Sequence, residues 1–210
     1  MRYLLHQEAL VERIRVLRKK SIVKSAQDFQ DAADDIVEFA SSIESESDEY
    51  ISWVHDYAVI RLYREFESFI LDCLVGAINN DTTVLTETTR GEFPKHLTDE
   101  VCEFVITGSG YFDFKGRDGL IKTLKKYVPA DHYLLDVIKK PKHRPYIEKL
   151  CALRNFAAHN SDVAQKAVLV ALDAERIGSA SSWLKRQTRL KDIADGLNAL
   201  AVEVKAAAPY

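Results

Sequence analysis

The amino-acid sequence predicts an all-α protein. Apolar side chains recur at helical spacing through almost the whole chain of 210 residues, and we find no convincing strand pattern, heptad array or internal repeat. Apolar residues make up 47% of the chain, which is enough for a hydrophobic core. We therefore expect a helical bundle over residues 47–210, preceded by an N-terminal helical extension over residues 1–46 that can also pack as part of the same domain.

Two helices of opposite charge are expected in the N-terminal extension. Residues 3–20 predict a basic helix, and residues 25–42 predict an acidic one with apolar side chains at helical spacing. A break at residues 45–48 offers an N-cap for a long helix that extends to about Ile78. The apolar stripe of this long helix marks it as the central core helix: Val59, Leu62, Tyr63, Phe66, Ile70, Cys73, Leu74 and Ala77.

Short helices and loops are predicted between the central helix and residue 141. The expected loops cover residues 79–95, which are Thr-rich and polar, and residues 108–119, which begin with Gly108-Ser109-Gly110. The expected helices cover residues 97–106, 120–128 and 132–138. The segment Pro141–Pro145 then leads into an amphipathic helix, Tyr146 to Ala158, with a proline near its first turn.

The C-terminal quarter of the chain predicts further helices. Ser161 or Asp162 can cap a helix over residues 163–177. The Gly- and Ser-rich stretch 178–182 predicts a break, and residues 183–208 predict a final helix or a pair of helices.

The hexapeptide Arg154-Asn155-Phe156-Ala157-Ala158-His159 is the most informative motif of the chain. At about 100° per residue, Arg154 falls on the same stripe as Leu150, Cys151, Ala157 and Ala158. A guanidinium on an apolar face keeps its charge and needs an anion or hydrogen-bond acceptors. Glu67 and Glu65 are the candidate carboxylates.

Asn155 and His159 are predicted neighbours on an adjacent face of the same helix. Residues four apart lie one above the other, so the Asn155 amide can orient the His159 imidazole. Asn160 follows directly, and because asparagine tolerates the left-handed conformation it can end the helix. A structural arginine and a helix-capping histidine are the alternative interpretation of this motif.

On these residues the sequence resembles the HEPN superfamily of all-helical domains, whose nuclease members carry an arginine, then a polar residue, then a histidine a few positions on. Arg154, Asn155 and His159 match that pattern. The stretch Tyr63-Arg64-Glu65-Phe66-Glu67-Ser68-Phe69-Ile70 is similar to the aromatic and acidic helix of the branch called RiboL-PSP-type or MAE-type HEPN domains. The resemblance covers about residues 47–200.

The resemblance implies a metal-independent endoribonuclease with Arg154, Asn155 and His159 as catalytic residues and Glu67 in support. A neutral imidazole, with an ordinary pKa of about 6.5, can take the proton of the RNA 2′-hydroxyl. A fixed guanidinium can stabilise the charge that grows on the phosphoryl oxygens. The products would be a 2′,3′-cyclic phosphate and a 5′-hydroxyl, and DNA, which lacks the 2′-hydroxyl, would not be cut.

The spacing of the motif predicts a constraint on the site. On a continuous helix Arg154 and His159 diverge by about 140° and by ~7.5 Å along the axis. Either the helix ends before His159, or two chains combine their motifs. HEPN nucleases resemble the second case, with a cleft across a two-fold interface, so we expect a homodimer.

Charge is distributed unevenly along a chain whose net charge is only −3. Residues 1–24 hold seven Lys/Arg against two Glu, residues 28–67 hold twelve Asp/Glu against two Arg, and residues 115–159 hold eleven Lys/Arg against four Asp/Glu. Such runs are often solvated helix faces. The third run contains the motif, which favours a basic surface for RNA. His143 and Arg144 are candidate phosphate contacts, and the alternative is that both side chains are simply exposed to solvent.

Other features of the sequence exclude several classes of site. No run approaches about 18 apolar residues, so no membrane span is predicted. The scattered cysteines, Cys73, Cys102 and Cys151, and the absence of a signal-peptide pattern predict reduced thiols in a cytoplasmic protein. The histidines show no metal-ligand spacing, and the Gly108–Gly110 loop lacks a phosphate-binding signature, so we expect no metal and no cofactor.

Two functions from different classes remain open at this stage. The first is the HEPN-type endoribonuclease, which family analogy would make a toxin or a phage-defence effector. The second is a non-catalytic HEPN-like helical module that binds a protein partner or nucleic acid. An inhibitory or regulatory protein partner is compatible with either. Tyr111, Phe112 and Phe114, near Lys115 and Arg117, can stack on RNA bases or pack into the core.

Overall fold

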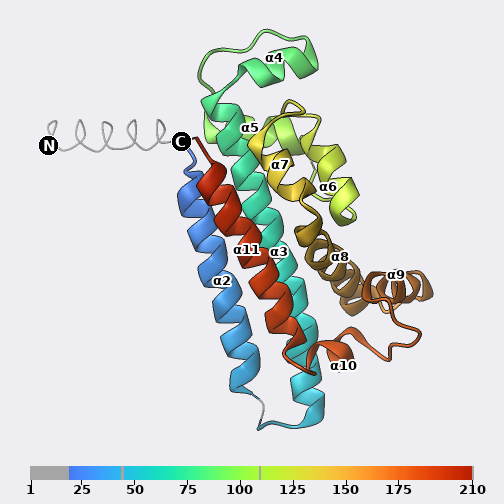
Figure 1. The fold of residues 1–210 in the computed structure, drawn as a ribbon. Helices are drawn as coiled ribbons and strands as arrows, with labels where there is room; N and C mark the ends of the chain where they lie inside the picture. Colours follow the sequence, from blue (N-terminus) through green and yellow to red (C-terminus); the bar gives the residue numbers. More distant parts are fainter. Residues whose placement is uncertain (1–18, 44, 109, 210) are drawn as a thin grey trace, which may run out of the picture.

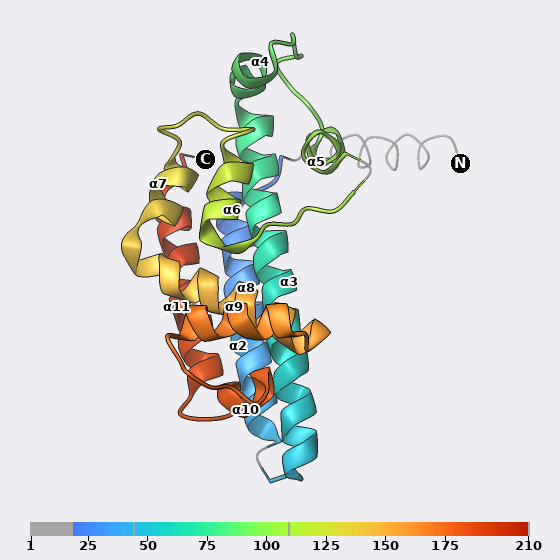
Figure 2. The same ribbon diagram turned by 90° about the vertical axis from the view of Figure 1, so that its right-hand side faces the viewer.

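The computed structural model describes residues 19–43, 45–108 and 110–209, and over these residues the fold is entirely helical, which confirms the predicted all-α class. The elements are α2 (Ile22–Ser42), α3 (Asp48–Asn80), α4 (Thr83–Thr89), α5 (Asp99–Thr107), α6 (Gly116–Leu124), α7 (Tyr133–Lys139), η1 (Pro141–His143), α8 (Arg144–His159), α9 (Asp162–Leu172), α10 (Ala180–Leu184) and α11 (Arg189–Ala207). Three long helices, α2, α3 and α11, run side by side, and α8 and α9 run across them (Figures 1 and 2).

The central helix of the bundle is α3, as the sequence predicts. It has 33 residues and is therefore about 50 Å long. Ser47 caps it by accepting a hydrogen bond from the Tyr50 backbone, and Asp48 and Glu49 lie in its first turn, where carboxylates favour the helix dipole. Helices α2, α5, α8 and α10 all pack on α3, which is therefore their common support.

Helix α2 belongs to the bundle core. Ile22, Ala26 and Ala33 are fully buried, and the Phe29 ring stacks on Phe69 of α3 at a centroid distance of 5.2 Å. The second part of the predicted N-terminal extension therefore packs as part of the same domain. Most of the predicted basic helix over residues 3–20 lies outside the described residues.

Helix α11 makes close contacts with α8 and with the segment that precedes α8. Gly196 of α11 lies against the ring of Tyr146, and a β-carbon at Gly196 would come within 2.3 Å of that ring. At the other end of α11, the Glu203 carboxylate pairs with Lys140 at 2.6 Å and also with Lys142. These cations hold the pKa of Glu203 down to about 2.

Three predicted loops or breaks contain helix instead. α4 lies in the predicted loop 79–95, α6 begins at Gly116 inside the predicted loop 108–119, and α10 occupies the predicted break 178–182. Tertiary contacts explain the differences. Leu85 is fully buried, Glu148 of α8 accepts from the Arg117 backbone at the start of α6, and Asp56 of α3 accepts from the Ser181 backbone of α10.

Among the helices of the described residues, none is both long and apolar enough to cross a membrane.

Candidate functional site

The motif lies at the C-terminal end of α8, which packs between α3 and α9. Ile147, Leu150, Leu153 and Phe156 form its buried face. Asn160 ends the helix in the left-handed conformation, with φ 41° and ψ 43°, and its backbone N–H donates to the Phe156 carbonyl, which confirms the predicted stop.

Arg154 lies at the edge of the buried face and is only partly buried. Its guanidinium carbon lies over the Tyr63 ring of α3, 4.3 Å from the centroid, an arrangement in which the π face attracts the cation. Its Nη1 donates to Asn155 Oδ1 at 2.7 Å. The predicted stripe is buried only in part, because Ala158 is exposed and the buried face extends instead to Leu153 and Phe156.

The acceptors that Arg154 uses differ from the carboxylates named from the sequence. Glu65 pairs with Arg61 at 2.6 Å, and within the described chain no carboxylate lies at ion-pair distance from Arg154. Glu67 forms no hydrogen bond or ion pair with Arg154 in the described chain, but the two charges attract through space. Burial and Asp113 raise the pKa of the Glu67 carboxyl, and the Arg154 cation opposes part of this rise. An aromatic face and a neutral amide leave much of the guanidinium charge uncompensated.

A second acid beside Glu67 raises the local negative charge. Tyr63 donates through its hydroxyl to Asp113 Oδ1 at 3.0 Å, which brings Asp113 into the cluster. Burial, and next the Asp113 carboxylate, raise the pKa of Glu67 from 4.5 to about 6, and Arg154 opposes this only in part. A carboxyl whose pKa is raised toward neutral pH is of the kind that serves in proton transfer.

His159 is the last residue of α8, and its side chain is exposed. Among the described residues no side chain or backbone group hydrogen-bonds to its imidazole. The expected contact from Asn155 is not formed, since the Asn155 oxygen accepts from Arg154 instead. Because the helix is continuous through His159, Arg154 and His159 point in directions about 140° apart.

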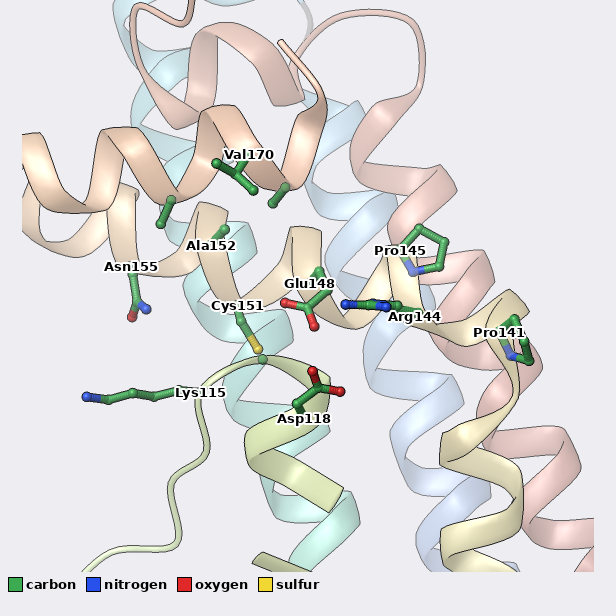
Figure 3. A pocket seen from close by; sticks show the side chains of 13 residues that line it. Lys115, Asp118, Pro141, Arg144, Pro145, Glu148, Cys151, Ala152, Asn155 and Val170 are labelled. Atoms are coloured by element: carbon green, nitrogen blue, oxygen red, sulfur yellow. The ribbon is translucent and has the colours of Figure 1, made fainter. Parts of the chain in front are cut away.

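A cleft of about 720 Å³ lies beside Asn155, between α8, α9 and the start of α6 (Figure 3). The side formed by α8 is mixed: Arg144, Glu148 and Asn155 are polar, and Pro145, Cys151 and Ala152 lie between them. The side formed by α9 is apolar; its lining residues are Ala167, Val170 and Ala171. This volume is within the range typical of ligand-binding sites, about 300–1,000 Å³.

Two cations and two carboxylates line the cleft, but they are not equally available. Glu148 accepts from the Arg117 backbone at 3.1 Å, and Asp118 lies 3.8 Å from the Arg117 guanidinium. Within the described residues, Lys115 and Arg144 form no ion pair and no side-chain hydrogen bond. The cleft is therefore lined by equal numbers of cationic and acidic side chains, and the two cations are the ones without a partner among the described residues.

The cysteine in the cleft wall is not a nucleophile at neutral pH. Cys151 is 5% exposed, and burial raises the pKa of its thiol to about 12. All three cysteines are free and buried, in agreement with the prediction from the sequence.

The two candidate phosphate contacts, His143 and Arg144, have different surroundings in the structure. Arg144 is exposed and lines the cleft. His143 is 2% exposed and lies 3.3 Å from Glu203, so it faces α11 and cannot reach a phosphate at the surface. Burial lowers the pKa of His143 more than Glu203 raises it. The proline-bounded turn that leads into α8 turns this side chain inward.

Three residues of the site do not follow from the sequence pattern. The pattern places Tyr63 in the core stripe and in the aromatic and acidic stretch without linking it to Arg154, it gives no signal for Asp113, and it indicates Lys115 only as a neighbour of aromatic side chains. Phe112 and Phe114 are buried, whereas Tyr111 is 97% exposed. Tyr63 and Glu67 are one turn apart on α3, which is a usable signal, but nothing in the sequence connects them to Asp113.

Comparisons with known proteins add no relative. No protein-family model matches the chain, no curated protein matches it, and no solved structure matches it. Within the described residues, no group of three or more His, Cys, Asp or Glu side chains is arranged to hold a metal ion.

Proposed function

We propose that this protein is a metal-independent endoribonuclease of HEPN type that acts as a homodimer. The observation that carries the proposal is how Arg154 and His159 of α8 are partnered and exposed. Arg154 is held by the Tyr63 ring and the Asn155 amide, and His159 is exposed; in the part of the chain that the structure describes, Arg154 has no ion pair and His159 has no hydrogen-bond partner. A structural arginine would be expected to satisfy its charge with a carboxylate.

The proposed reaction uses the RNA 2′-hydroxyl as nucleophile. His159 takes its proton, the 2′-oxygen attacks the adjacent phosphorus, and the bond from phosphorus to the 5′-oxygen breaks. Arg154 neutralises charge on the phosphoryl oxygens, and the departing 5′-oxygen takes a proton from water. Glu67, with a pKa of about 6, is the second group near Arg154 that can carry a proton.

The divergence of Arg154 and His159 supports a site shared between two chains. In this arrangement Arg154 of one chain and His159 of the other contact the same phosphate. Light scattering should show twice the chain mass of 23.8 kDa at concentrations where RNA is cut. A fully active monomer would require the catalytic pair to come from one chain and would overturn this part of the proposal.

The activity is tested by incubating the purified protein with total RNA in EDTA. Wild type should cleave, and His159→Ala should lose about 10²–10⁴-fold of the rate, the usual contribution of a general base. His96→Ala is the matched control, since His96 is also exposed but lies in the segment between α4 and α5. A strict requirement for Mg²⁺, or unchanged cleavage by His159→Ala, would overturn the mechanism.

A second function, a non-catalytic module that binds a protein partner, is favoured by one separate observation. Phe39, Tyr50, Trp53 and Tyr57 are each more than half exposed near the α2–α3 turn. Exposed aromatic side chains of this kind are typical of protein interfaces. In that case the protein would bind its protein partner and would not cut RNA. A role as a cytoplasmic toxin or phage-defence effector, with an inhibitory partner, belongs to the first proposal.

A further inference from the structure

The cleft between α8 and α9 has two chemically different walls. Val170, on the α9 wall, is 83% exposed although it is apolar, and Ala167 and Ala171 continue this wall. The α8 wall carries Arg144 and Asn155. In Figure 3 α8 lies between α9, which carries Val170, and the start of α6, which carries Asp118, and Lys115 lies in the segment before α6. A ligand that fits must therefore be anionic along one side and apolar along the other.

The polar wall continues toward the proposed catalytic histidine. At about 100° per residue, Arg144, Glu148, Cys151, Asn155 and His159 fall within about 80° of one another on α8. The distance from Arg144 to His159 along the helix axis is about 22 Å. The cleft thus opens along the same helix face that ends at His159.

Two cations and two carboxylates lie along this face, and they differ in their partners. Glu148 accepts from the Arg117 backbone and Asp118 lies 3.8 Å from the Arg117 guanidinium, whereas Lys115 and Arg144 have no partner among the described residues and are free to bind an anion. Phosphate is the anion that lysine and arginine bind most readily at such a surface, and nucleobases provide an apolar face for Val170.

We propose that this cleft is the subsite that holds single-stranded RNA beside the scissile phosphate. Lys115 and Arg144 bind backbone phosphates, Asn155 contacts the nucleotide next to the scissile bond, and the bases lie against the α9 wall. This inference rests on the proposed ribonuclease function and names where its substrate lies. It also assigns the exposed valine of α9 a role in binding.

Binding is measured separately from cleavage, by fluorescence anisotropy with a labelled random pool of 2′-O-methyl oligonucleotides of about twelve nucleotides. These oligonucleotides lack the free 2′-hydroxyl and are not cut. The double variant Lys115→Ala/Arg144→Ala should bind about tenfold more weakly. Its plot of log affinity against log salt should be shallower by about 1.4, the value for two lost phosphate contacts to a single strand.

Matched controls are available for charge and for the apolar wall. Lys125→Ala/Lys126→Ala removes two exposed cations outside the cleft and should change affinity by less than about twofold. Val170→Glu places a negative charge on the exposed wall and should also weaken binding about tenfold. Val202→Glu, at a half-exposed position on α11, should not. Circular dichroism should show that all four variants keep the helical fold.

The outcomes separate this inference from the proposed function. If wild type cuts RNA but the cleft variants bind the pool as wild type does, the cleft inference is wrong and the ribonuclease stands. If wild type neither binds the pool nor cuts RNA, both are wrong. If Val170→Glu instead converts a dimer into monomers in light scattering while RNA affinity is unchanged, the cleft wall is an interface between copies, which also overturns the inference.

Discussion

Replacing Glu67 with glutamine should stabilise the folded protein, and the effect should depend on pH. The pKa of Glu67 is raised from 4.5 to about 6 because burial and Asp113 disfavour its ionised form. Below pH 4.5 the carboxyl is neutral in both the folded and the unfolded chain and contributes nothing. As the pH rises through 6 the folded protein must hold an unfavourable charge, so stability is lost.

The magnitude follows from the shift in pKa. A rise of about 1.5 units corresponds to about 2 kcal/mol, and because Glu67 is partly exposed to water we take half of this, about 1 kcal/mol. For a chain of 210 residues this equals about 2–4 °C in Tm. Glu67→Gln should therefore melt about 2–4 °C above wild type at pH 8, and the difference should vanish near pH 4.

The assay is thermal unfolding followed by circular dichroism at several pH values between 4 and 8. Glu65→Gln is the control, because Glu65 lies on the same helix but pairs with Arg61. This control should show no stabilisation at pH 8. A Glu67→Gln variant that is no more stable than wild type at pH 8, or equally stabilised at both ends of the range, would refute the reasoning.

Three further predictions follow from the structure. Arg154→Lys should lose RNA cleavage although it keeps the charge, since a lysine cannot donate from a planar fork while stacked on Tyr63; near wild-type rates would contradict this. Gly196→Ala should lower the free energy of unfolding in urea by about 1–3 kcal/mol, because the new methyl group overlaps Tyr146, and an increase in stability would refute the contact. The three buried cysteines should react slowly with a thiol reagent at pH 8 and fully in urea; rapid labelling of the folded protein would show that the thiols are accessible.

In the motif helix α8, some features can be predicted from the periodicity of the sequence and others cannot. Its left-handed stop at Asn160 follows from local rules and agrees with the structure. The helix begins at Arg144, two residues before the predicted start, and its buried face includes Leu153 and Phe156, which the predicted stripe did not contain. The partners of Arg154 do not follow from local rules. Tyr63 lies on a helix 91 positions earlier in the chain, so only the packing of α8 on α3 brings the ring under the guanidinium.

His143 is a second residue whose surroundings local rules do not predict. Its place in a basic, proline-bounded segment predicts an exposed side chain, yet it is buried against Glu203 of α11. The pairing joins residues 60 positions apart, and no local pattern carries that information.

Local patterns in the sequence are enough to predict the helical class, the central helix and the position of the motif, because helical periodicity and capping are properties of neighbouring residues. Three features arise only from long-range packing: the short helices α4 and α10, the inward turn of His143, and the cleft along α8. Each depends on contacts between segments far apart in the chain, where burial and hydrogen bonding outweigh local preference.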